Sequence, residues 1–344
     1  MSQTQSSQGH SSVSPEPIFQ MVWGPMPAQL LKTAVSLEVF THIAQGKRQV
    51  AELASATGAV PRNLEILLNA LAGLKLLQKP TADSYGLTPL AETYLVKGQP
   101  AYMGDFTFQV DGLWQPWGQI EQVIRHGVPQ QTLQERPDLV ENFKKLVPQL
   151  FPITFPNAMA LAGQLGTGRS WKPKQLLDVA AGSGAWGIAF AKQDPDLRVT
   201  AWDFEPVLEI TRDFTSRLGV ADQFDYLGGD IWQTEPAAGS FDAALLGHIC
   251  HGYGPDQNLE LFRRIHKALV PGGRILIADF IPDENRSSET FPLLFAANMM
   301  AVTPEGNTYT LSEYSDWLAR TGYSQVEPIE IPPFPGAIVS AVKE

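Results

Sequence analysis

The chain has 344 residues, of which 44% are hydrophobic and 18% charged, and its net charge is −11. This length predicts two domains, and the acidic balance disfavours nucleic acid as a partner because phosphate backbones would repel it. No apolar run reaches membrane-helix length, the N-terminus has no secretory h-region, and the single cysteine, Cys250, excludes an internal disulfide. We therefore expect a cytoplasmic protein with no membrane partner.

The chain order predicts four segments. Residues 1–17 are rich in Ser and Gln and should form a disordered tail, because they have nothing to bury. A small helical domain follows at 18–98, then a helical linker region at 99–170. The change to strand–helix alternation places an α/β domain at 171–344.

The small domain shows three helical patterns and then a hairpin. An apolar stripe at Leu30–Ile43 follows Pro27, helices are expected at Val50–Thr57 and Pro61–Leu77, and turn residues mark a hairpin at Lys79–Leu87. This order is typical of a winged helix, which can bind DNA or mediate dimerisation. The acidic charge favours dimerisation through the apolar stripe.

Aromatic residues are concentrated between residues 98 and 156. For each one taken singly, packing between helices is the better interpretation. Together they could wall an apolar ligand pocket, for which Trp114 and Phe155 are weak candidates.

The second half alternates strands with helices, which predicts a parallel sheet covered on both faces. The last two strands should pair as an antiparallel edge because only a short connection joins them. The expected strands are Gln175–Ala180, Leu197–Asp203, Phe224–Leu227, Phe241–His248, Arg274–Phe280, Val326–Ile331 and Ala337–Val342, and the expected helices between them are Trp186–Gln193, Pro206–Leu218 and Gln257–Leu269.

A glycine-rich turn follows the first of these strands. Gly182, Gly184 and Gly187 allow close backbone approach to a ligand at a helix N-terminus. Asp203, at the end of the next strand, can accept hydrogen bonds from both hydroxyls of a ribose. This pattern also fits the nicotinamide site of a dehydrogenase, so by itself it leaves two readings.

Three further features favour a sulfonium cofactor. Asp178 lies inside the first strand, where a carboxylate suits a cationic methionine group better than a pyrophosphate. Asp230 can accept from an adenine amino group while Ile231 packs on the ring, and Pro271-Gly272-Gly273 marks the turn into another strand.

From about Ala28 onward the chain resembles the plant-type, or hydroxyindole-type, small-molecule O-methyltransferases, and especially their bacterial relatives. The motifs that carry the resemblance are LLDVAAGSG, WDFEPVLEI, GGDIW, CHGYGPDQNLELFRRIHKAL and PGGRILIADFIPDE. The resemblance implies a class I methyltransferase domain with a Rossmann-like seven-stranded sheet, an N-terminal α-helical winged-helix dimerisation domain, and S-adenosylmethionine as cofactor. It also implies a homodimer and a small-molecule acceptor.

The resemblance also carries roles to particular residues. His251 matches the family's catalytic base, and Asp279 falls where a Glu often orients that base. Asp203 and Phe204 lie in the cofactor motif WDFEPVLEI, and Gly247 stands where many members have a Lys that contacts the cofactor.

Other positions depart from the family pattern or are weak candidates. Gly252-Tyr253 replaces the usual Asp-Trp, and Thr308 replaces a second Glu. Asn298 and Met299 lie in a region that borders the acceptor in the family. His248 is expected to point away from His251, and with no carboxylate partner motif in view we expect no metal site.

The function predicted from these residues is O-methylation of a phenolic or enolic small molecule with His251 as general base. Methyl transfer to carbon or nitrogen remains an alternative. So does a catalytically inactive regulator that binds the cofactor and uses its winged helix on DNA, because the positions beside His251 are altered.

Overall fold

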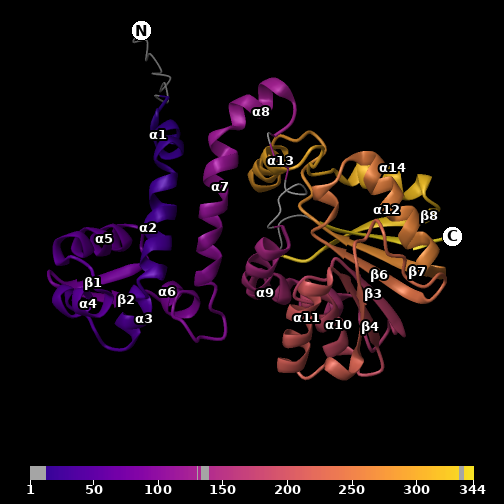
Figure 1. Cartoon of the computed structure of the whole chain (residues 1–344), viewed down its shortest axis with the longest axis horizontal. Coiled ribbons are helices and arrows are strands. Elements are labelled where there is room, and N and C mark those ends of the chain that lie inside the picture. Colours follow the sequence, from indigo (N-terminus) through magenta and orange to yellow (C-terminus); the bar gives the residue numbers. More distant parts are fainter. Residues whose placement is uncertain (1–12, 130, 133–138, 333–336) are drawn as a thin grey trace, which may run out of the picture. The chain divides into compact units, whose positions relative to one another are not determined.

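The computed structural model describes residues 13–129, 131–132, 139–332 and 337–344. The chain divides into two compact units, Met1–Val110 and Asp111–Glu344, which are treated separately below (Figure 1). Most of the tail expected at residues 1–17 lies outside the described residues, and the first helix begins at Glu16. Among the described residues, no helix combines the length and apolar character that crossing a bilayer requires.

The first unit consists of short helices and one two-stranded hairpin, and within the part of the chain that the structure describes five helices precede the hairpin where the sequence predicted three. Its elements are α1 (Glu16–Trp23), α2 (Pro25–Ser36), α3 (Val39–Ala44), α4 (Val50–Thr57), α5 (Pro61–Gly73), β1 (Leu77–Thr81), β2 (Ser84–Leu87), α6 (Pro89–Tyr94) and the 3₁₀ helix η1 (Gly104–Phe108).

The apolar stripe that motivated the dimer prediction packs inside this unit. The chain breaks at Glu38, which has a left-handed φ of 50°, so the expected single helix is α2 followed by α3. The break turns the stripe inward, and its members are buried together with α5: Ala34, Val35, Val39, Phe40 and Ile43. Most of the stripe is therefore used in the core of this unit, because periodicity shows that a face is apolar but not what covers it, and the homodimer through the N-terminal helices stays a prediction.

The second unit contains the predicted strand–helix alternation. Its helices are α7 (Gln109–Gly118, which crosses the boundary between the units), α8 (Ile120–His126), α9 (Leu139–Gln164), α10 (Ala185–Gln193), α11 (Glu205–Arg217), η2 (Ala221–Gln223), η3 (Cys250–Gly252), α12 (Pro255–Ala268), α13 (Thr290–Val302) and α14 (Leu311–Arg320). Its strands are β3 (Gln175–Val179), β4 (Arg198–Asp203), β5 (Phe224–Gly228), β6 (Phe241–Gly247), β7 (Leu269–Ala278), β8 (Tyr323–Glu330) and β9 (Ala337–Lys343).

These strands form one seven-stranded sheet in the order β5-β4-β3-β6-β7-β9-β8. The first five are parallel, whereas β9 pairs antiparallel with both β7 and β8. The antiparallel pairing of the last two strands is thus confirmed. One detail differs from expectation: β7 already begins at Leu269, and Pro271-Gly272-Gly273 lies within it, where the register with β6 shifts.

Alternate strand residues pack into two cores on opposite faces of the sheet. Leu176 and Leu245 pack with α9, α10 and α11, whereas Leu177 and Leu246 pack with α12 and α14. Because five strands are parallel, their carboxyl ends lie along a single edge. This edge is where sheets of this kind bind ligands, and it brings together the ends of β3 to β7.

Candidate active site

The glycine turn links β3 to α10 through left-handed backbone. Ala180, Gly182 and Gly184 have φ values of 52°, 57° and 73°. A Cβ at Gly184 would lie 2.8 Å from the Thr211 Cγ2 atom, and one at Gly187 would lie 2.8 Å from the Asp178 Oδ2 atom. The turn therefore needs small residues to bring the N-terminus of α10 to the ligand-binding edge of the sheet.

Asp203, the last residue of β4, holds this turn. Its Oδ2 accepts a hydrogen bond from the Gly182 N–H at 2.8 Å, and its Oδ1 accepts from the Phe204 N–H at 2.7 Å. Burial raises the pKa of the Asp203 carboxyl to about 6, although both hydrogen bonds oppose the rise. Since each carboxylate oxygen has two lone pairs, Asp203 keeps capacity to accept further donors.

Asp178 is buried between β3 and α10. Its Oδ2 accepts from the Gly187 N–H at 2.9 Å, which fixes the first turn of the helix. Its Oδ1 has no hydrogen-bond partner within the part of the chain that the structure describes. Burial raises the pKa of Asp178 to about 7 and the nearby Asp203 charge adds to this, against the Gly187 hydrogen bond.

The segment after β5 reaches the same edge of the sheet. The Gly229 N–H donates to the Asp203 carbonyl at 2.9 Å, and Asp230 Oδ1 accepts from the Trp232 N–H at 2.8 Å. Ile231 is buried in the core on the α12 side. The predicted residues Asp203, Asp230 and Ile231 are thus brought together, as the sequence motifs implied.

Gly247 ends β6 directly beneath an indole ring. A Cβ at this position would lie 2.4 Å from Trp186 Nε1 and 2.5 Å from Trp186 Cδ1. Trp186, in the first turn of α10, therefore fills the space that a longer residue at 247 would need. The family resemblance had marked Gly247 as a departure, but it gave no indication of this indole.

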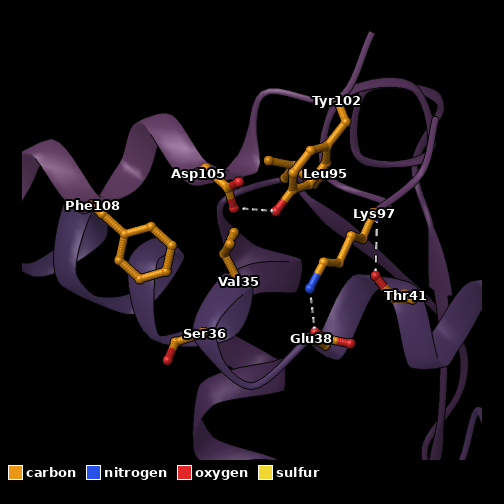
Figure 2. Close-up of a pocket in the computed structure, with 9 residues that line it drawn as sticks. All are labelled: Val35, Ser36, Glu38, Thr41, Leu95, Lys97, Tyr102, Asp105 and Phe108. Atoms are coloured by element: carbon orange, nitrogen blue, oxygen red, sulfur yellow. Dashed lines mark hydrogen bonds and ion pairs between the residues drawn. The ribbon is translucent and has the colours of Figure 1, made fainter. Parts of the chain in front are cut away.

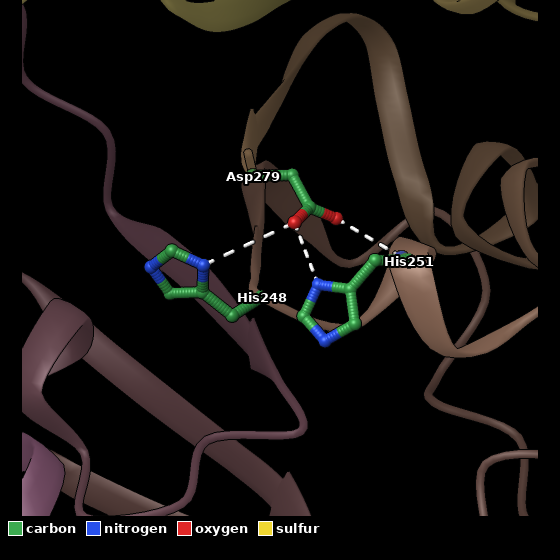
Figure 3. A group of neighbouring side chains, drawn as sticks. All are labelled: His248, His251 and Asp279. Atoms are coloured by element: carbon green, nitrogen blue, oxygen red, sulfur yellow. Dashed lines mark hydrogen bonds and ion pairs between the residues drawn. The ribbon is translucent and has the colours of Figure 1, made fainter. Parts of the chain in front are cut away.

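His251 and Asp279 form a hydrogen-bonded pair at the carboxyl ends of β6 and β7 (Figure 3). His251 Nδ1 lies 2.6 Å from Asp279 Oδ1, and the His251 N–H donates to Asp279 Oδ2 at 3.0 Å. The Asp279 side chain is 2% exposed and that of His251 13% exposed. The imidazole thus faces a buried carboxylate on one side and retains limited access from the other.

Further groups hold the Asp279 carboxylate in its charged form. The Phe280 N–H donates to Oδ1 at 2.8 Å, and the Tyr314 hydroxyl donates to Oδ2 at 3.3 Å. Burial alone would raise the pKa of Asp279, but the two nearby imidazoles and the hydrogen bonds outweigh it and hold the pKa below its usual value. Tyr314, on α14, had no signal in the sequence.

His248 also faces Asp279, contrary to the expectation that it points elsewhere. Its Nδ1 lies 4.0 Å from the same Oδ1 that His251 contacts. Asp279 is therefore the carboxylate partner that the sequence analysis did not find for the two histidines. The backbone at His248 is left-handed, with φ of 58°. The three-residue spacing between His248 and His251 in the sequence could not reveal this local change of chain direction.

Phenylalanine rings surround this pair of imidazoles. The Phe280 ring centroid lies 4.7 Å from that of His248 and 6.0 Å from that of His251. Phe295, on α13, lies 4.8 Å from His251, edge to face, and Phe291 packs against Phe280 at 5.0 Å. The surroundings of the two imidazoles are therefore apolar and aromatic.

The residues that depart from the family pattern take structural roles. The Thr308 hydroxyl donates to the Pro292 carbonyl at 3.2 Å, so it does not orient His251. Tyr253 packs its ring edge-on against Trp232 at 5.0 Å. Burial raises the pKa of Tyr253 to about 12, so the phenol stays neutral.

The weak acceptor candidates are distributed over three helices. Trp114 is exposed on α7, and Phe155, on α9, stacks on Phe151 at 4.9 Å within the core. On α13, Asn298 accepts from Trp117 Nε1 at 3.0 Å and Met299 is buried. Phe295, one turn before Met299, is the residue of α13 whose ring contacts His251.

A separate cavity of about 190 Å³ lies in the first unit (Figure 2). Four of its polar side chains form two pairs. Lys97 Nζ contacts Glu38 at 2.9 Å, and the Tyr102 hydroxyl donates to Asp105 at 2.8 Å. The pair of Lys97 with Glu38 ties the segment after α6 to the junction of α2 and α3. We assign the cavity no ligand.

Two family models match this chain. The O-methyltransferase domain matches residues 171–324, and the O-methyltransferase dimerisation domain matches residues 20–97, so together they cover more than half of the sequence. The chain belongs to the O-methyltransferase family. It is therefore a methyltransferase that uses S-adenosylmethionine, and the dehydrogenase reading of the glycine turn is set aside.

Individual relatives agree with this assignment. The tetracenomycin polyketide synthesis 8-O-methyl transferase of Streptomyces glaucescens is 29% identical over 91% of this chain and 92% of its own length. The 3-hydroxy-5-methyl-1-naphthoate 3-O-methyltransferase of Streptomyces sahachiroi is 28% identical over 96% of this chain and 95% of its own length. A solved structure from Nostoc punctiforme, described as an O-methyltransferase, superposes with a TM-score of 0.88 at 26% identity, covering 97% of this chain and all of that one. The predicted family and fold class are thus confirmed.

Proposed function

We propose that this O-methyltransferase methylates a hydroxyl group of a phenolic or enolic small molecule, with His251 as the general base. The observation that carries the proposal is the 2.6 Å contact between His251 Nδ1 and the buried Asp279 carboxylate at the ligand-binding edge of the sheet. The two curated relatives named above, which by their names act on a polyketide and a hydroxynaphthoate, support a phenolic acceptor.

The residues at the edge of the sheet fit S-adenosylmethionine. Gly182 and Gly184 keep the turn free of side chains, Asp203 has lone pairs left for the ribose hydroxyls, and Asp230 with Ile231 suits the adenine. Phe204, the residue directly before α11, follows Asp203, and Gly247 borders the same edge. Asp178 supports the first turn of α10, and its unpartnered Oδ1 is suited to a nearby cation. When bound, the cofactor supplies an electrophilic methyl group.

Proton removal falls to His251 in this proposal. With its Nδ1–H donated to Asp279, the imidazole presents the lone pair of Nε2 to the acceptor hydroxyl. As the hydroxyl proton moves to Nε2, the imidazole becomes positively charged, and the Asp279 carboxylate stabilises that charge without taking the proton. Asp279 thus acts by fixing the tautomer and orientation of the base.

Substitution of His251 tests the proposal. For His251→Asn we expect turnover to fall by about 10²- to 10⁴-fold, the usual worth of a positioned base. Affinity for S-adenosylhomocysteine, measured by calorimetry, should stay unchanged because the cofactor residues lie elsewhere. Asp279→Asn should lower turnover less than His251→Asn does. In both variants the loss of turnover should be smaller with a more acidic phenol, because such an acceptor depends less on a base. His126→Asn, at an exposed histidine on α8, is the matched control. Near-normal turnover of His251→Asn would show that another group removes the proton.

We also propose that the protein is a cytoplasmic homodimer, with residues 18–98 as its winged-helix dimerisation domain. The match to a dimerisation domain supports this, and α1 exposes a row of apolar side chains: Ile18, Phe19, Met21, Val22 and Trp23. The helical linker region 99–170 is proposed to contribute to the acceptor pocket, and 171–344 to form the cofactor-binding methyltransferase domain. Trp114, Phe155, Asn298 and Met299 remain candidate acceptor contacts.

A further inference from the structure

Four hydrogen bonds converge on the buried carboxylate of Asp279. Its Oδ1 contacts His251 Nδ1 at 2.6 Å and accepts from the Phe280 N–H at 2.8 Å, and its Oδ2 accepts from the His251 N–H at 3.0 Å and from the Tyr314 hydroxyl at 3.3 Å. Each carboxylate oxygen has two lone pairs, so these contacts use the capacity of both. Three of the four come from residues that follow β6 and β7, whereas Tyr314 lies on α14, 35 positions further along the chain.

The packing of α14 fixes the position of the Tyr314 ring. The helix begins with a capping box, in which the Thr310 hydroxyl accepts from the Glu313 N–H and Glu313 Oε2 accepts from the Thr310 N–H. Tyr314 is 1% exposed, and its ring lies edge-on to those of Tyr309 at 6.1 Å and Trp317 at 5.8 Å. A ring packed in this way cannot move its hydroxyl without disturbing the core around it.

The hydroxyl of Tyr314 remains a hydrogen-bond donor because it stays protonated. Burial raises the pKa of this phenol well above its usual value, and the charge of Asp279 adds to the rise. Other titratable groups around Asp279 are also neutral at neutral pH, because burial raises the pKa values of Cys250 and Tyr309 and lowers that of His248 to about 4. The charge of the carboxylate is therefore held by the four hydrogen bonds described above.

We propose that Tyr314 is a positioning residue for methyl transfer, which acts through Asp279 by holding the carboxylate in the orientation that aligns the base His251. The inference rests on the proposed function, in which His251 removes the acceptor proton, and it adds a residue from a separate helix to that machinery. Without the hydroxyl, Oδ2 keeps only the His251 N–H as a donor, and the carboxylate is held less firmly against rotation. Its charge is also shared among fewer donors, so it pulls more strongly on the Nδ1 proton of His251.

The proton on His251 Nδ1 gives a direct measure of this coupling. Hydrogen bonds to a carboxylate are short and strong, and such a proton has an NMR resonance at low field, which is assigned by its loss in His251→Asn. On protein saturated with S-adenosylhomocysteine at low temperature, Tyr314→Phe should move this resonance to still lower field, because the substitution removes only the competing hydroxyl and keeps the ring. An unchanged resonance would overturn the proposal.

Turnover gives the second readout. With 2-naphthol as acceptor, kcat of Tyr314→Phe should fall about tenfold, the lower end for a hydrogen bond to a charged group. Affinity for S-adenosylhomocysteine, measured by calorimetry, should be unchanged. In an Asp279→Asn background the same substitution should change kcat by less than about twofold, because the residue through which it acts has been altered. Equal losses in both backgrounds would show that Tyr314 does not act through Asp279.

Tyr323→Phe is the matched control. Tyr323 is 2% exposed and its hydroxyl donates to the Phe262 carbonyl at 3.2 Å, so it makes a buried hydrogen bond of its own to another partner. We expect this variant to keep the wild-type resonance and the wild-type kcat. A shift of the same size as in Tyr314→Phe would mean that loss of any buried hydroxyl disturbs the site, which contradicts the assignment to Tyr314.

The same measurements separate failure of this inference from failure of the proposed function. If His251→Asn keeps near-normal turnover, the base proposal fails and the catalytic role of Tyr314 fails with it, even where the resonance shifts as expected. If His251→Asn loses turnover while Tyr314→Phe matches the wild-type protein in both readouts, only the inference on Tyr314 fails.

A metal ion at this position is the remaining alternative. His248, His251 and Asp279 offer ligand atoms within 4.8 Å of one another, a spacing that suits a metal ion. A metal ion on Nδ1 of His251 would replace its proton. A low-field resonance that is absent from the wild-type protein and appears only after treatment with a chelator would therefore overturn the proposal.

Discussion

Asp203 shows how a single residue can serve the fold and the ligand at once. It accepts two backbone hydrogen bonds that close the glycine turn, and burial nevertheless raises its pKa to about 6. A raised pKa means that the carboxyl takes up a proton at a pH where an ordinary Asp would be ionised. The charged form, which is the better acceptor for ribose hydroxyls, is therefore lost early as the pH falls.

From this we predict a pH-dependent cofactor affinity. The dissociation constant of S-adenosylhomocysteine should rise by up to about tenfold per pH unit below about pH 6, because binding then requires removal of a proton. In Asp203→Asn, affinity at pH 8 should be about 10-fold weaker or more, and the contribution of Asp203 to the pH dependence should disappear. Calorimetry between pH 5 and pH 8 measures both, with Asp225→Asn, at an exposed position on β5, as control. A flat profile for the wild-type protein would contradict the prediction.

At the scale of elements, the end of β6 and the first turn of α10 fit together only because residue 247 is glycine. A Cβ there would meet the Trp186 indole at 2.4 Å, which is far inside van der Waals contact. The indole in turn lies beside the His248 ring, so a change at residue 247 acts on both the cofactor side and the acceptor side of the site.

Gly247→Ala should therefore destabilise the protein by about 1–3 kcal/mol, the usual cost of overpacking. Denaturant unfolding provides the measurement. Gly252→Ala is a matched control, because a Cβ at Gly252 meets nothing within 4 Å. In the double variant Gly247→Ala with Trp186→Leu, the loss of unfolding free energy should be smaller than the sum of the losses in the two single variants, because the clash with the indole is removed. Additive losses would mean that the two residues do not interact.

For the whole molecule, the exposed apolar side chains of α1 form a surface that needs an explanation. Phe19 and Trp23 are stacked with centroids 6.2 Å apart, yet they are 50% and 59% exposed. Apolar side chains gathered in this way on a short helix indicate a contact with another surface. Since the family model here is a dimerisation domain, a second copy of the chain is the expected partner.

We predict that the wild-type protein sediments as a dimer at micromolar concentration. Phe19→Asp with Trp23→Asp should yield monomers, because the introduced charges would be buried without partners in the interface. Val60→Asp adds a charge at an exposed apolar residue elsewhere in the same unit, before α5, and should leave the dimer intact. A wild-type monomer would refute the dimer, and a dimeric double variant would show that another face forms it.

The alternation of strands and helices in the second unit, its parallel sheet and the residues at the carboxyl edge of that sheet could be predicted from the sequence. These features have local signals: the periodicity of strands and helices, a glycine turn, and acids that end successive strands. Parallel strands bring their carboxyl ends to one edge, so residues as distant as His251 and Asp279, 28 positions apart, could be placed together from the pattern and the resemblance.

What each side chain faces could not be predicted and became visible in the packed structure. The stripe at Leu30–Ile43 is buried because the chain breaks at Glu38, and His248 turns toward Asp279 because its backbone is left-handed. Tyr314 reaches the same carboxylate across 35 positions of sequence. Contacts of this kind depend on how separate elements pack, and a pattern of hydrophobic and polar residues along one element carries no information about its neighbour across the core.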